Sequence, residues 1–142
     1  MSQYLSFCLK RKDTSELKIE LGYWCTTPSR TLSSEGIFPY TEDTTLVTPD
    51  RYKEYMDGLD YYIKSTEDSI HREQELNYRE LFQNSKSKEA AEFAYDRMIE
   101  SESFIKEMDE EIDLYKDIRK TIQTYWAIAQ ENPQYDLYYI NC

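Results

Sequence analysis

The sequence predicts an α+β fold: a small antiparallel β-sheet, made of an N-terminal hairpin and a C-terminal strand, packed on a long antiparallel helical hairpin. Three observations predict it. Apolar and polar side chains alternate in residues 3–25, as in half-buried strands. Apolar side chains recur every three or four residues from 87 to 132, as in a helix that packs on a partner helix. Residues 135–142 follow Asn132-Pro133, which ends that helix, and are rich in β-formers.

Length and charge limit the class of protein. A chain of 142 residues predicts a single domain spanning 1–142. Its net charge of −11, from 28 acidic and 17 basic residues, argues against direct binding to nucleic acid and to anionic membranes. The N-terminus lacks the pattern of a signal peptide, and no run of 18 apolar residues occurs. We therefore expect a cytoplasmic protein that does not bind membranes.

The three cysteines, Cys8, Cys25 and Cys142, are an odd number at unrelated spacings, without a C-x-x-C motif. Reduced thiols are the expectation for such a set in a cytosolic protein. A disulfide between Cys8 and Cys25 stays open, because both cysteines fall in or beside predicted strands.

The first 48 residues contain the hairpin and a long connection. Asp13-Thr14-Ser15 supplies turn chemistry between its two strands. In residues 26–48 we expect a short helix that is capped by Thr27, starts at Pro28 and ends at Gly36. The apolar residues Ile37 and Phe38 then either pin this connection to the core or form part of a functional loop; pinning is favoured.

The first long helix is predicted over 49–84. Thr48 caps it, Pro49 fits its first turn and Asp50 suits the positive end of its dipole. The strict repeat fails near the end of this range, where the apolar face drifts to Gln74, Tyr78, Leu81 and Phe82. Before that point the side chains that face the partner helix keep the repeat: Tyr52, Met56, Leu59, Ile63, Thr66 and Ile70. Gly58 inside the helix costs about 1 kcal/mol relative to alanine, which a close crossing would explain.

The second helix is predicted over 87–132, with Ser87 as its cap. The short polar connection before it predicts an antiparallel neighbour. Residue 49 should then lie opposite residue 122, so that the last turns overhang and pack on the β-hairpin with Trp126 largely buried. The seam is interrupted by Arg119 and otherwise comprises Ala91, Ala94, Met98, Ser101, Ile105, Met108, Ile112, Tyr115, Ile122, Trp126 and Ala129.

No pattern typical of an enzyme occurs. His71 is the only histidine, and a di-iron carboxylate site needs its acid-x-x-His unit twice. With three glycines the chain has no Gly-rich phosphate loop, and no placed base is evident for a serine nucleophile. We therefore expect a non-enzymatic protein without a cofactor or a metal.

An acidic run on the second helix has two interpretations. It contains Glu107, Asp109, Glu110 and Glu111. A solvated helix face is the favoured one, and the other is an electrostatic surface for a basic partner or a mimic of nucleic-acid phosphates.

Three apolar positions per heptad are more than a two-helix seam can cover. Near the helix–helix connection several such side chains have no predicted cover: Leu76, Tyr78, Leu81, Phe82, Phe93 and Tyr95. We therefore expect a protein–protein interaction or assembly module, with 14 tyrosines suited to interfaces and a homodimer as one partnership. The alternative is an acidic inhibitor that occupies the basic groove of a nucleic-acid-binding protein, encoded by a phage or mobile element.

Overall fold

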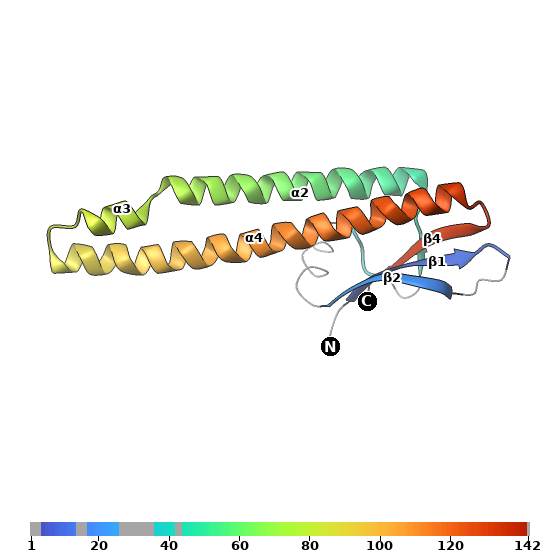
Figure 1. Ribbon diagram of the computed structural model, residues 1–142, viewed down its shortest axis with the longest axis horizontal. Coiled ribbons are helices and arrows are strands. Elements are labelled where there is room, and N and C mark those ends of the chain that lie inside the picture. Colours follow the sequence, from blue (N-terminus) through green and yellow to red (C-terminus); the bar gives the residue numbers. More distant parts are fainter. Residues whose placement is uncertain (1–3, 14–16, 26–35, 42–43, 142) are drawn as a thin grey trace. The chain divides into compact units, whose positions relative to one another are not determined.

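In the residues that the computed structural model describes, an antiparallel sheet with strand order β2-β1-β4-β3 accompanies the helices α2, α3 and α4 (Figure 1). The structure describes residues 4–13, 17–25, 36–41 and 44–141, with backbone alone for Tyr4 and 17–25. The elements are β1 (Tyr4–Arg11), β2 (Leu17–Cys25), β3 (Thr45–Leu46), α2 (Pro49–Glu75), α3 (Tyr78–Gln83), α4 (Lys88–Glu131) and β4 (Tyr135–Asn141). The predicted α+β class is confirmed.

The described chain groups into two compact units. Unit 1 contains Met1–Tyr61 and Leu114–Cys142, and unit 2 contains Tyr62–Asp113. Both α2 and α4 contribute residues to each unit, because the boundaries fall inside these helices. The single domain expected from chain length stays a prediction.

Strand β1 lies at the centre of the sheet, where Phe7 is opposite Gly22 of β2 and Tyr139 of β4. The predicted pairing of the C-terminal strand with an edge of the hairpin is therefore confirmed. Strand β3 adds a fourth, two-residue strand beside β4. The register also decides whether Cys8 and Cys25 can form a disulfide. Cys25 is opposite Tyr4, which is four residues from Cys8. At about 3.3 Å per residue that separation is about 13 Å, too far for a disulfide.

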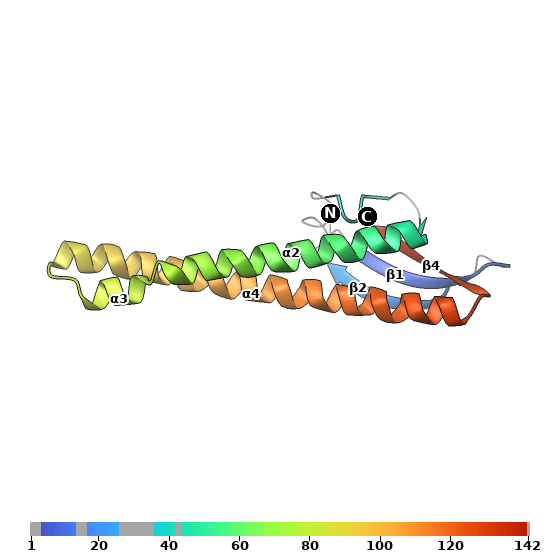
Figure 2. The same cartoon turned by 90° about the horizontal axis from the view of Figure 1, so that it is seen from above.

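Within unit 1, α2 and α4 run side by side over the sheet (Figure 2), and the buried core residues come from these helices, from the strands and from the connection at Ile37 and Phe38. Phe38 is fully buried at the centre of this core, with ring centroids 5.6 Å from Phe7, 4.7 Å from Tyr55 and 5.6 Å from Tyr139. Other side chains of unit 1 that are at most 3% exposed are Leu5, Leu9, Val47, Tyr55, Leu59, Tyr115, Ile118, Ile122, Leu137, Tyr139 and Asn141. The interpretation that Ile37 and Phe38 pin the connection is therefore confirmed.

Gly58 lies where that connection approaches α2. A Cβ atom at Gly58 would lie 2.9 Å from Cγ1 of Ile37. The close approach expected at this glycine is therefore real, but a loop side chain makes it and not a crossing helix. The short helix expected at 27–36 lies outside the described residues, apart from Gly36, which has a positive φ of 83°.

Both helix starts follow the predicted capping. The amide of Arg51 donates to Thr48 Oγ1 at 3.2 Å, and the amide of Ala90 donates to Ser87 Oγ at 3.1 Å. The predicted continuous helix over 49–84 is wrong, because α2 ends at Glu75 and α3 starts at Tyr78. Between them Asn77 adopts a left-handed conformation, with φ 44° and ψ 58°, which asparagine tolerates better than most residues.

The helix register in unit 1 also differs from the prediction. Tyr52 stacks on Trp126, with ring centroids 4.7 Å apart, and Asp60 pairs with Arg119. Residue 49 therefore lies beyond residue 126, and Trp126 is half-buried against α2 instead of largely buried in an overhang on the hairpin. The predicted register assumed a helical rise of about 1.5 Å per residue through residue 84. Residues 76–77 and 84–87 are not helical and span more length per residue, so residue 49 lies further along α4 than predicted.

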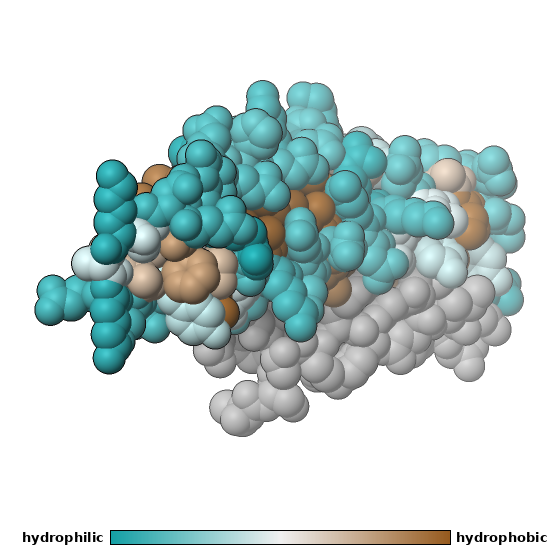
Figure 3. All heavy atoms as spheres, turned by 60° about the vertical axis from the view of Figure 1, so that its left-hand side comes forward, coloured by the Kyte–Doolittle hydropathy of each residue, from teal (hydrophilic) through white to brown (hydrophobic). Residues whose placement is uncertain are grey.

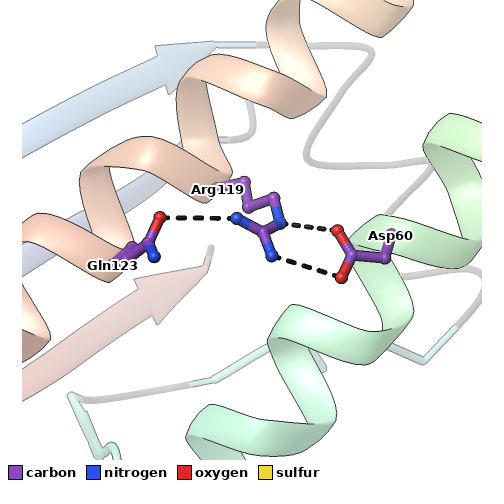
Figure 4. Close-up of polar contacts among 3 residues, drawn as sticks. All are labelled: Asp60, Arg119 and Gln123. Carbon is purple, nitrogen blue, oxygen red and sulfur yellow. Dashed lines mark hydrogen bonds and ion pairs between the residues drawn. The ribbon is translucent and has the colours of Figure 1, made fainter.

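Arg119 interrupts the apolar seam because it forms a bidentate ion pair (Figure 4). Its Nε donates to Asp60 Oδ1 at 2.6 Å and its Nη2 donates to Oδ2 at 3.2 Å, while Nη1 donates to Gln123 Oε1 at 3.4 Å. The hydrogen bond that Arg119 donates to Asp60 raises the pKa of Arg119 above its ordinary value, so the guanidinium stays charged. The planar fork matches the carboxylate in geometry and links α2 to α4 within unit 1.

Candidate functional site

Unit 2 buries a narrow apolar seam and leaves larger apolar side chains exposed. Its buried residues are small or slender and follow the predicted positions: Ile70, Ala94, Met98, Ser101 and Ile112. Among the described residues of the whole chain, ten large apolar side chains are exposed, and seven lie between residues 76 and 104. These seven are Leu76, Leu81, Phe82, Phe93, Tyr95, Ile99 and Phe104.

One open groove lies where α3 meets the first turns of α4. It has a volume of about 470 Å³ and is lined by six residues, hereafter the α3–α4 groove: Phe82, Lys88, Ala91, Glu92, Tyr95 and Asp96. The rings of Phe82 and Tyr95 have centroids 5.6 Å apart and form its apolar wall. Figure 3, which brings this part of the chain forward, shows apolar side chains exposed there with hydrophilic ones around them.

The groove runs along α4. Its five α4 residues are spaced as i, i+3, i+4, i+7 and i+8, which is one stripe of a helix surface. Ile99, four residues after Tyr95, extends the same stripe by one turn and is 47% exposed. Ile99 was not among the residues predicted from the sequence, although its spacing of four residues from Tyr95 was available as a signal.

A second apolar face lies on the other side of the α4 seam. Phe93 and Tyr95 are two positions apart, or about 200° around a helix, so they flank the buried Ala94 on opposite sides. Arg97 lies over the ring of Phe93 at 5.4 Å, and Phe104 is exposed about three turns further along. We call Phe93 and Phe104 the opposite flank. The two α4 aromatic residues of the predicted set, Phe93 and Tyr95, therefore lie on different faces of the helix.

The remaining apolar residues of the predicted set lie at the break between α2 and α3 or within α3. Leu76 and Leu81 are exposed, while Tyr78 is half-buried and lines a small groove of about 110 Å³. An ion pair between Arg79 and Glu102, at 2.5 Å, borders that groove. The side chain of Asn77 both accepts from the Glu80 amide and donates to the Glu80 carboxylate, which fixes the start of α3.

The acidic run is accessible. Glu107, Asp109 and Glu110 are exposed and form no ion pair with another described residue, while Glu111 is half-buried. Unit 2 contains fifteen acidic and seven basic side chains, so it carries −8 of the chain's −11. This surface therefore combines exposed apolar side chains with a strong negative charge.

Other features of the described residues offer less chemistry. His71 is exposed, and no group of three or more His, Cys, Asp or Glu side chains in the described part of the chain is placed to hold a metal ion. A groove of about 300 Å³ in unit 1 has its polar ends, Lys12 and Asp136, within 3.6 Å of each other. No helix among the described residues combines the length and apolar character needed to cross a membrane.

No protein-family model, no curated protein and no solved structure matches this chain.

Proposed function

We propose that this protein is a non-enzymatic interaction module that docks another protein on the exposed apolar surface of unit 2. The observation that carries the proposal is the clustering of seven of the ten exposed large apolar side chains between residues 76 and 104. Scattered exposed apolar residues are normal on soluble proteins, but a concentrated set bordered by polar residues is typical of an interaction site. Covering a half-exposed Tyr95 or Ile99 would contribute about 1 kcal/mol each.

The experiment is capture of partners from cells of the native host with the full chain as bait. Phe82→Ser with Tyr95→Ser should remove the partner, because both rings lose apolar contact area. The matched control is Tyr61→Ser, which replaces a side chain that is 69% exposed but lies in unit 1. Circular dichroism should show unchanged helix content in all variants.

Equal capture by the wild type, the double variant and the control would refute docking on this surface. If the control variant also lost every captured protein, the capture would be due to non-specific binding by exposed apolar side chains and not to docking on unit 2.

A second candidate function is occupation of the basic groove of a nucleic-acid-binding protein by the acidic run. The observation in its favour is that Glu107, Asp109 and Glu110 are exposed without ion-pair partners among the described residues. Replacing these three residues and Glu111 by their amides should slow association with such a protein, and more so at low salt. DNA should compete with the wild-type chain for the captured protein, and failure to compete would eliminate this candidate.

A further inference from the structure

We propose that the α3–α4 groove binds a basic, amphipathic helix of a partner protein. The inference rests on the proposed function and deepens it by naming the chemistry of the docked segment. Its shape, its apolar wall and its acidic rim each point to the same ligand.

The shape fits a helix. The groove follows one stripe of α4 from Lys88 to Asp96, a span of about 12 Å at 1.5 Å per residue, and Ile99 continues the stripe beyond the groove. Phe82 of α3 closes one side of it. A rod-like segment laid parallel to α4 would contact the whole stripe, which is the mode in which amphipathic helices bind grooves.

The apolar wall provides anchor positions. Phe82, Tyr95 and Ile99 are 37%, 47% and 47% exposed, so each has surface left to bury. Ala91 lines the groove one turn before Tyr95 on the same stripe of α4, and it contributes only a small apolar side chain. Because Tyr95 and Ile99 are four residues apart, a docked helix would meet them with apolar residues at a similar spacing.

The rim selects a basic ligand. Glu92 and Asp96 are four residues apart and border the apolar stripe. Asp96 forms no ion pair with another described residue, and Glu92 has only an exposed contact with Lys88 at 4.0 Å. With a net charge of −8, unit 2 repels a second copy of itself and attracts lysine- or arginine-rich segments.

The test uses a fluorescein-labelled synthetic peptide of about 18 residues, with leucine on one helical face and lysine elsewhere. Its fluorescence anisotropy is measured on titration with the full chain. Two control peptides carry glutamate in place of lysine, or the same composition in an order without amphipathic spacing. We expect binding of the first peptide alone, with a Kd that rises as salt is added.

Paired variants locate the bound peptide. Tyr95→Ser with Ile99→Ser, and separately Glu92→Gln with Asp96→Asn, should each weaken binding about tenfold or more. The matched controls remove exposed apolar area or negative charge outside the groove and outside the other proposed binding surfaces: Tyr40→Ser with Tyr61→Ser, and Asp68→Asn with Glu75→Gln. Each control should change the Kd by less than about threefold.

Equal losses in groove and control variants would overturn the proposal, because the attraction would then be a general effect of charge. Binding of the glutamate peptide, or no binding of the lysine peptide, would overturn it as well. Capture of partners from host cells shows whether the proposal of a basic ligand fails alone or together with the proposed docking function. A captured protein that is lost with the Tyr95 and Ile99 variant but is indifferent to the Glu92 and Asp96 variant would keep the docking function and reject a basic ligand.

Discussion

Tyr55 places a phenol hydroxyl in the core of unit 1, where its side chain is 3% exposed. Burial raises its pKa well above the ordinary value of about 10, and interaction with Tyr139, including a hydrogen bond between their hydroxyls, adds to the shift. The folded state therefore holds this proton more tightly than the unfolded state does. The resulting stability is present below pH 10 and is lost as the pH rises, since the unfolded chain releases the proton first.

The first prediction follows from that sign. The free energy of unfolding of the wild type should fall from about pH 10 upward, and Tyr55→Phe should fall less steeply, although it is about 1 kcal/mol less stable at pH 7. Urea denaturation at pH 7 to 11 measures both slopes. Tyr138→Phe is the control. Burial also raises the pKa of this half-buried tyrosine, so its replacement should make the fall of stability with pH less steep, but by a smaller amount than Tyr55→Phe does. Parallel slopes for wild type and Tyr55→Phe would contradict the assignment.

The second prediction concerns the stacked pair Tyr52 and Trp126, whose rings are inclined by 8°. A double-mutant cycle with Tyr52→Ala and Trp126→Ala should give a coupling free energy of about 0.5–1.5 kcal/mol. Urea denaturation of the four proteins measures it. Additive losses would mean that the stacking adds nothing to the burial of each ring.

At the scale of elements, α2 tolerates a glycine in its interior because Ile37 occupies the space of the missing side chain. We predict that Gly58→Ala, which usually stabilises a helix by about 1 kcal/mol, destabilises this one by about 1–3 kcal/mol. In an Ile37→Ala background the same replacement should become stabilising. Urea denaturation in both backgrounds checks this, and an identical effect in both would show that Ile37 is not the obstacle.

Sequence patterns predicted the elements well where one face is buried. The α4 seam is half-buried at Ile105 and Met108 and buried, as its heptad spacing indicated, at Ala94, Met98, Ser101, Ile112, Tyr115 and Ile122. In β1 the predicted apolar face of Leu5, Phe7 and Leu9 is buried, but Ser6 and Cys8 on the other face are buried too, so the predicted half-buried strand is wrong there. Capping by Thr48 and Ser87 was predictable because it depends on residues within one turn.

What escaped prediction depends on contacts between distant residues or on a single backbone angle. Strand β3 has two residues, too few to show alternation. The break at Asn77 has no Gly or Pro to mark it, and the position of Phe82 beside Tyr95 depends on that break. The groove was therefore visible in sequence only as a set of apolar residues without predicted cover.

At the scale of the whole molecule, self-association is opposed by charge and favoured by the opposite flank. Two copies carry twice −11, or −22, and salt screens this repulsion over about 8 Å at physiological strength. Burial of Phe93 and Phe104 is not screened, so we predict a homodimer that tightens as salt rises. Light scattering coupled to size exclusion should show about 34 kDa in high salt, and Phe93→Ser with Phe104→Ser should return the mass toward 17.1 kDa.

A mass of 17.1 kDa for the wild type at tens of micromolar in high salt would reject the homodimer. The salt dependence also distinguishes this association from docking of a basic helix in the α3–α4 groove, because the latter weakens as salt rises.

The central position of β1 in the sheet has a consequence for the time course of biosynthesis. Its partner β4 is separated from it in the sequence by all of unit 2, with Leu5 opposite Asn141. At 5–20 residues per second a ribosome needs on the order of ten seconds to make the intervening chain. A two-stranded hairpin is marginal alone, so β1 and β2 must wait through that interval while the local helical contacts of unit 2 can already form. We therefore expect nascent chains to depend on chaperones until β4 has emerged.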